Sequence, residues 1–388
     1  MTKPKGLFYL AIFTVILLWI QARMPTWNNH MQVDVWVMWE RLNYWMTHNH
    51  SFVGITGNEI LPATLLYLFT PLGLVPVGGL VYANFLPIMM MLNAITLGAH
   101  WFFVNNKYIF LTSLLFLGPI LLFRFDGLVT LLLLLSFYTF ANGKYAQSGF
   151  SLGLATGMKV FPIIFLPYLI LILLNNKHIK GLQQLLVFFG EALIVPVLIF
   201  FLLGGTYPQI LAALAFHSQK LISIESLPGS MITGWSLLTH GHPPIMIPGN
   251  GIWAVAGPSA LLNRSWLLPI ALIYIAVYLR KNLVKKFNYL IPYTLILIFL
   301  VFSKNLNPQY LWWFMAILPF ISPSPLTWGI TLVVALLNQL VFPLFYTIFV
   351  DSFFGHNQNY WIYYLLLLRN IGIIFLCYLS IRELFSKK

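Results

Sequence analysis

The run LQQLLVFFGEALIVPVLIFFLL, residues 182–203, decides the class of fold. It contains one charged side chain, Glu191, and about 20 apolar residues in a helix span the hydrocarbon core of a bilayer. Similar runs recur along the chain, and they do not alternate apolar and polar residues as membrane β-strands do. In lipid a helix satisfies its own backbone hydrogen bonds, so these runs predict a bundle of spanning helices.

The composition excludes an ordinary soluble protein. Of the 388 residues 60% are hydrophobic and 7% are charged, whereas soluble domains carry about 25% charged residues. The net charge of +13 comes from basic residues in short connections between apolar runs, a pattern that indicates membrane orientation and no nucleic-acid partner. The single cysteine, Cys377, excludes an internal disulfide and a cysteine-based metal site.

The distribution of basic residues predicts the topology. Lys3 and Lys5 precede the first run, Arg280 to Lys286 form a basic connection, and Lys387 and Lys388 end the chain. By the positive-inside rule, both termini are cytoplasmic. We therefore expect an all-α, polytopic protein of the plasma membrane with about 12 spanning helices, and outer-face loops that carry interfacial helices. The expected apolar segments include residues 166–174, 290–302, 309–321 and 329–350, and a second large outer loop covers about residues 204–261.

The first large outer loop, residues 25–59, contains a candidate catalytic carboxylate. Asp34 precedes the aromatic stretch VWVMW, residues 35–39. A general base needs an ionised group that is oriented toward the substrate proton and sheltered from bulk water. The alternative is an interfacial anchor helix whose charges are incidental, since Trp and Tyr are enriched at the membrane surface.

Several cations are predicted on the outer side, where the charge bias does not call for them. If they converge, they suit a phosphate-bearing ligand. Each also has a simpler explanation: Arg124 can pair with Asp126, Lys159 can snorkel, and Lys304 can cap a helix end. The outer cations are Arg124, Lys159, His217, Lys220 and Lys304.

Two ionisable residues, Glu191 and Arg369, fall within predicted spans. Such groups are expensive in lipid and are often functional, but these two can also form a structural pair. The nine histidines show no metal-ligand spacing with acidic neighbours.

Six motifs together resemble the C-type glycosyltransferase (GT-C) superfamily, in particular the prokaryotic mannosyltransferases that extend phosphatidylinositol mannosides. In chain order they are Asp34-Val-Trp36, Leu61-Pro62 leading to TPLG (70–73), Arg124-Phe-Asp126, SGFSLGLATGMKVFP (148–162), HSQK (217–220) leading to Glu225-Ser226, and SKNLNPQYLWW (303–313). The likeness extends from about residue 5 to 322, which implies one integral membrane domain with a GT-C-like catalytic region over residues 1–322 and additional helices over residues 323–388.

The resemblance implies that a hexose moves with inversion from a polyprenyl-phosphate donor to a hydroxyl of a glycolipid or glycan acceptor at the outer face. The resemblance to mannosyltransferases implies that this hexose is mannose. Asp34 would be the base, and the five outer cations would bind the donor phosphate. The residues implied to support the pocket are Glu40, Glu59, Asp126, Glu225, Gln309 and Tyr310.

The chain departs from the family pattern at three positions. Lys220 stands where Arg is usual, so a bidentate contact to phosphate is lost there. Glu59 stands in place of an aromatic residue before Ile60-Leu61-Pro62. Asp34 lacks the second carboxylate of the metal-dependent members, so neither a divalent metal nor another cofactor is expected.

Two other classes of function stay open at this point. A transporter or flippase for lipid-linked glycans needs a site near the membrane midplane and usually has internal repeats. No repeat relates the two halves, and the unusual charges gather at the outer face, so the enzyme is favoured. A non-enzymatic assembly subunit would leave Asp34 dispensable.

Overall fold

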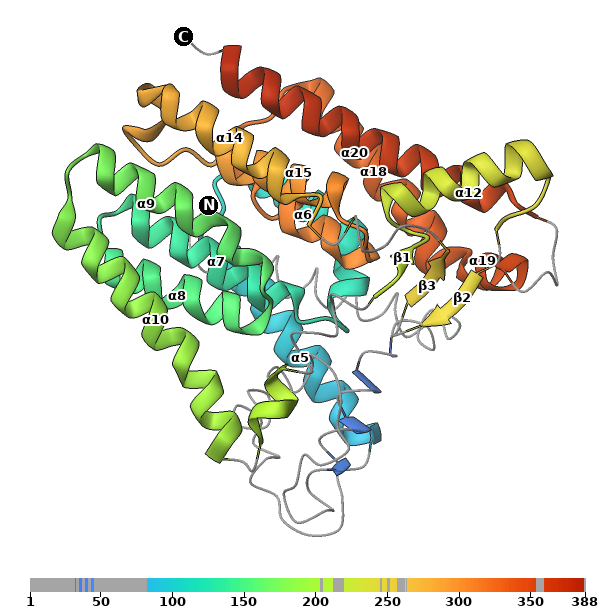
Figure 1. Ribbon diagram of the computed structural model, residues 1–388. Helices are drawn as coiled ribbons and strands as arrows, with labels where there is room; N and C mark the ends of the chain where they lie inside the picture. The colour runs from blue at the N-terminus through green and yellow to red at the C-terminus, as the bar shows by residue number, and fades with distance from the viewer. Residues whose placement is uncertain are drawn as a thin grey trace.

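The protein is described by a computed structural model and is mostly helical (Figure 1). The structure describes residues 82–386 apart from 203–204, 212–219, 245, 250–251, 257–261, 263 and 354–358, together with residues 32, 35, 36, 39, 40, 43 and 44. Asp34, Glu59 and His217 lie outside the described residues.

Helices follow one another along most of the described chain. They are α5 (Tyr82–His100), α6 (Lys107–Leu121), α7 (Asp126–Ala141), α8 (Tyr145–Met158), α9 (Leu166–Asn175), α10 (Ile179–Leu202), α12 (Leu227–His240), α14 (Leu267–Leu279), α15 (Leu290–Phe302), α16 (Leu311–Met315), α17 (Leu318–Ile321), α18 (Pro325–Gln339), α19 (Tyr346–Phe353) and α20 (Trp361–Ser386). Short 3-10 turns occupy Phe161–Phe165, Lys281–Val284 and Pro308–Tyr310.

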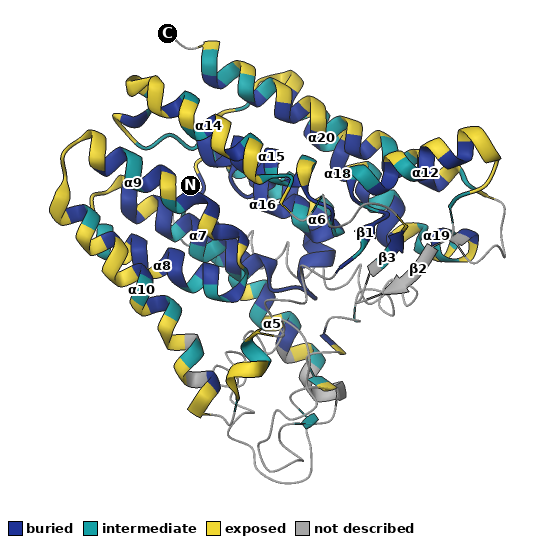
Figure 2. Ribbon diagram, viewed as in Figure 1, coloured by how far each residue is buried: buried dark blue, intermediate teal, exposed yellow. Residues whose placement is uncertain are grey.

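Three of the described helical segments are long and apolar enough to cross a membrane: Ile179–Leu202, Pro325–Leu344 and Trp361–Ser386. Other apolar helices of the described chain have 10–17 residues, so the predicted number of about 12 spans is not reached there. Large apolar side chains are nevertheless exposed on α10, α14 and α20 (Figure 2), for example Leu198, Leu272 and Leu368. This surface indicates association with a membrane.

Glycines bring α8 and α10 close together. A Cβ atom at Gly149 would lie 2.2 Å from the carbonyl oxygen of Leu185, and one at Gly153 would lie 2.5 Å from that of Phe189. Only glycine fits these contacts, and small residues spaced four apart allow two helices to pack backbone to backbone in lipid. The motif at residues 148–162 therefore fixes α8 against α10, and with it the place of Lys159 at the end of α8.

Buried aromatic residues join the remaining helices. Trp312 on α16 is fully buried and donates from its indole nitrogen to the hydroxyl of Thr130 on α7, at 2.8 Å. His100 of α5 lies 3.1 Å from the same hydroxyl. These contacts connect three helices at one point and satisfy the buried polar groups.

Two predicted spans are interrupted. The segment 309–321 contains the short helices α16 and α17 instead of one helix, and Pro319, which has no N–H group, stands at the start of α17. The predicted span 329–350 breaks after α18, where Phe342 has non-helical angles and Pro343 follows. Proline and local packing override the apolar pattern at both places.

The second predicted outer loop, residues 204–261, contains a small sheet that the all-α prediction omitted. Strands β1 (Ile222–Ser223), β2 (Met246–Gly249) and β3 (Ile252–Val255) form an antiparallel sheet in the order β1-β3-β2. The helix α12 lies between β1 and β2 in the chain and beside α20 in space (Figure 1). The loop is thus a folded unit against the C-terminal helices.

Candidate functional site

Three of the sequence motifs meet around one buried carboxylate. Asp126 is the first residue of α7, and its side chain is 1% exposed. It accepts a hydrogen bond of 2.6 Å from the indole nitrogen of Trp313 and one of 2.7 Å from the ammonium of Lys159. The position at a helix N-terminus also favours negative charge. The motifs at 124–126, 148–162 and 303–313 therefore form one site.

Aromatic rings extend this site. Trp313 stacks on Phe161 with ring centroids 3.7 Å apart and on Tyr310 with centroids 4.1 Å apart. The ammonium of Lys159 lies 5.1 Å from the centroid of Tyr310 and 5.5 Å from that of Trp313, within the range of cation–π attraction. Lys159 is held by a carboxylate and two rings. Of the simpler explanations, the pairing of Arg124 with Asp126 and the snorkelling of Lys159 are not what the structure shows, because Asp126 pairs with Lys159.

Two more of the predicted cations contact each other. Lys304 follows α15, is 5% exposed, and donates from its ammonium to the carbonyl oxygen of Lys220. Its own carbonyl accepts from the backbone nitrogen of Ser223 at 2.9 Å. Burial lowers the pKa of Lys304. The residue at the C-cap position of α15 is Ser303, and Lys304 links two segments that are far apart in sequence.

Glu225 lies in the turn between β1 and α12 and is partly buried. Burial raises the pKa of this carboxyl group to about 7, against the nearby positive charges of Arg369 and Arg124, which favour the ionised form. Arg124 is 7% exposed. The carboxyl group therefore changes its charge near neutral pH, beside a predicted phosphate-binding arginine.

Arg369 is a member of this site that the sequence analysis did not assign to it. It is fully buried on α20 and donates to the backbone oxygen of Glu225 and to the side-chain oxygen of Asn338, the latter at 2.9 Å. Glu191, the other member of the structural pair that was left open, is exposed on α10. Arg369 instead bonds to Asn338 and to the backbone of Glu225, so that alternative is not realised. The sequence feature that could have indicated a role for Arg369 is its position as an arginine inside an apolar run.

The other predicted pocket residues have different positions. Gln309 is 4% exposed and Tyr310 is partly buried, and both belong to the 3-10 turn inside the last motif. Glu40 is exposed on a helical segment where Trp36 and Trp39 have ring centroids 4.8 Å apart. The positions predicted at Asp34, Glu59 and His217 lie outside the described residues.

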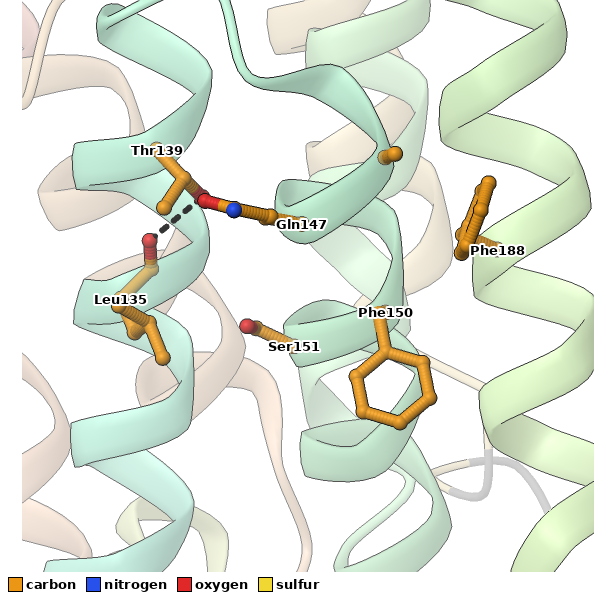
Figure 3. Close-up of a pocket in the computed structure, with 7 residues that line it drawn as sticks. Leu135, Thr139, Gln147, Phe150, Ser151 and Phe188 are labelled. Carbon is orange, nitrogen blue, oxygen red and sulfur yellow. Dashed lines mark hydrogen bonds between the residues drawn. The ribbon is translucent and has the colours of Figure 1, made fainter.

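A groove with a volume of about 300 Å³ lies at another place, between α7, α8 and α10 (Figure 3). Its lining is mostly apolar, and the hydroxyl of Thr139 is turned to its own helix, where it bonds to the oxygen of Leu135 at 2.7 Å. Thr139 is separated from Asp126 by 13 residues of α7, or roughly 20 Å at 1.5 Å per residue. This groove is not part of the charged site.

Among the described residues no group of three or more His, Cys, Asp or Glu side chains is placed to hold a metal ion. Comparisons with protein-family models and with curated proteins give no match to this chain.

Proposed function

We propose that the chain is an inverting glycosyltransferase that moves a hexose, by resemblance mannose, from a polyprenyl-phosphate donor to a hydroxyl group of a glycolipid or glycan. The observation that carries this proposal is the meeting of residues 124–126, 158–162 and 303–313 around Asp126. A buried carboxylate that gathers a cation and aromatic rings from distant motifs is the kind of charged cluster that is typical of functional sites.

The proposed chemistry assigns the base to Asp34. Its carboxylate takes the proton of the acceptor hydroxyl, the oxygen attacks the anomeric carbon, and the polyprenyl phosphate leaves from the opposite face. General-base assistance contributes a rate factor of about 10² to 10⁴.

Fixed cations stabilise the charge of the leaving phosphate in a site of low dielectric constant. Arg124, Lys159, Lys220 and Lys304 are proposed for this role, together with His217. Among the described residues, Lys159 contacts Asp126 and Lys304 contacts the backbone of Lys220. The residues proposed to support the pocket are Glu40, Glu59, Asp126, Glu225, Gln309 and Tyr310.

The proposed arrangement in the plasma membrane is polytopic, with about 12 spans, cytoplasmic termini and the site on the outer side. The helix α12 supports an outer loop in contact with lipid. Its exposed face carries Met231, Trp235 and Leu238, which are 58%, 69% and 75% exposed, whereas its buried face includes Ser230 and Thr233. A helix with its apolar side outward fits the membrane interface.

The test is transfer of labelled mannose from synthetic polyprenyl-phosphate mannose to cell-envelope lipids by the purified protein, with a chelator present. We expect label in lipid with wild type and a loss of at least about 100-fold with Asp34→Asn, the size of a general-base contribution. Equal transfer by both proteins removes Asp34 from this role. Movement of the intact donor across vesicle membranes, without transfer, identifies a flippase instead.

A further inference from the structure

We propose that Arg369 of α20 is a positioning residue of the donor-phosphate site, which it shapes by holding Glu225 beside Arg124. This inference rests on the proposed function. It extends the site to the C-terminal helices, for which the sequence motifs gave no role.

The guanidinium of Arg369 is enclosed by acceptors. It donates to Asn338 at 2.9 Å, to the side-chain oxygen of Asn370 at 3.2 and 3.1 Å, and to the backbone oxygen of Glu225. A buried arginine in an apolar helix is costly, and these four bonds engage all three of its nitrogens. Its direction is therefore fixed.

Asn370 fixes the same turn from a second side. Its amide nitrogen donates to the backbone oxygen of Glu225 at 3.1 Å and to the hydroxyl of Ser230 at 2.8 Å. Ser226 between them caps α12 by accepting from the backbone nitrogen of Gly229 at 3.2 Å. The backbone of Glu225 is held on both sides, so its carboxyl group starts from a defined place.

Arg369 also reaches the segment that carries Lys304. Asn338, which accepts from Arg369, donates to the backbone oxygen of Pro308 at 3.4 Å. At the other end of this segment, the oxygen of Lys304 accepts from Ser223 at 2.9 Å. The side chain of Arg369 thus connects the turn that contains Glu225 with the segment that contains Lys304. It acts on the site through these other residues.

The charge of Arg369 adds a second effect. Among the described residues, the charged groups that act on the Glu225 carboxyl are Arg369 and Arg124, and Lys220 and Lys304 lie on the adjoining segments. Ionised Glu225 lowers the positive potential around Arg124, and protonation of Glu225 raises it, so a phosphate at this place should bind more tightly when Glu225 is protonated. Because the pKa of Glu225 is about 7, both forms exist near neutral pH. Arg369 favours the ionised form.

Three substitutions separate position from charge. Glu225→Gln removes the charge and keeps the backbone oxygen that Arg369 and Asn370 bind. Arg369→Gln removes the positive charge. Arg369→Lys keeps the positive charge but removes the forked set of N–H donors of the guanidinium. The matched control is Arg280→Gln, because Arg280 also bonds to α20, at the oxygen of Phe385 at 2.7 Å, near the opposite end of that helix.

The first readout is pH-difference infrared spectroscopy of the full chain in nanodiscs, with the carboxylic-acid band of Glu225 assigned by its loss in Glu225→Gln. We expect the midpoint of this band to rise by about one pH unit in Arg369→Gln, as for the loss of one neighbouring cation. Arg369→Lys and Arg280→Gln should stay near wild type. An unchanged midpoint in Arg369→Gln overturns the proposal.

The second readout is binding of farnesyl phosphomannose, a short donor analogue whose phosphodiester does not titrate near neutral pH. Wild type should bind it about tenfold more weakly at high pH than at low pH, Glu225→Gln should show no such change, and Arg369→Gln should move the change upward. Identical pH profiles for wild type and Arg369→Gln overturn the role of Arg369. Absence of binding by wild type at every pH overturns the donor site itself, and this role with it.

Discussion

The ion pair between Asp126 and Lys159 predicts that removing the lysine lowers the free energy of unfolding more than neutralising the aspartate does. Lys159→Met leaves a carboxylate that is 1% exposed without its cation, whereas Asp126→Asn leaves an ammonium whose side chain is 28% exposed and can turn to water. Breaking a buried pair by removing one partner costs about 3–5 kcal/mol. Because Lys159 is partly exposed, we expect about 2–3 kcal/mol for Lys159→Met.

The loss for Asp126→Asn should be smaller, about 1 kcal/mol, because the asparagine oxygen can still accept from Trp313, which now bonds to Asp126 at 2.6 Å. The assay is equilibrium unfolding in mixed micelles by added denaturing detergent. Lys144→Met is the control, since Lys144 is exposed at the other end of α8 and its side chain makes no capping bond. A free-energy loss for Asp126→Asn equal to or above that for Lys159→Met refutes the reasoning.

Two further predictions concern packing and membrane contact. Gly149→Ala should lower the free energy of unfolding by about 1–3 kcal/mol in the same assay, because its Cβ would lie 2.2 Å from a backbone oxygen of α10. The control Gly190→Ala, whose Cβ would have nothing within 4 Å, should be neutral or stabilising. Equal losses of stability in the two variants would contradict this packing. Brominated lipids should quench the tryptophan fluorescence of wild type more than that of Trp235→Phe, because Trp235 is 69% exposed; equal quenching of the two proteins would place α12 away from lipid.

Apolar runs predicted helices well where proline stands only in the first turn, as Pro292 does in α15 and Pro167 in α9. The range predicted for α15, residues 290–302, is the observed one, and α9 ends one residue later than predicted. The break at Phe342 was not predicted, because the run stays apolar there, although Pro343 is a residue that can interrupt a helix. The strand pair Met246–Gly249 and Ile252–Val255 was missed inside a loop defined by its composition.

The sequence identified individual residues of the site, but it did not show which of them contact each other. Lys159 and Asp126 were both singled out, yet nothing in their sequence separation indicates that they bond to each other. Arg369 stood out as an ionisable group in an apolar run, but its partner, the backbone oxygen of Glu225, has no side-chain signature. Backbone acceptors are available at every residue, so only the three-dimensional arrangement selects one.

The dependence of mannose transfer on donor concentration tests the central claim, that the converging cations hold the donor phosphate. Loss of one charged hydrogen bond is worth about 1.5–3 kcal/mol. We therefore expect Lys304→Met to raise the KM for polyprenyl-phosphate mannose about 10- to 100-fold, Lys304→Arg to recover most of it, and the exposed-site variant Lys144→Met to match wild type. A KM for Lys304→Met equal to that of wild type would contradict the account.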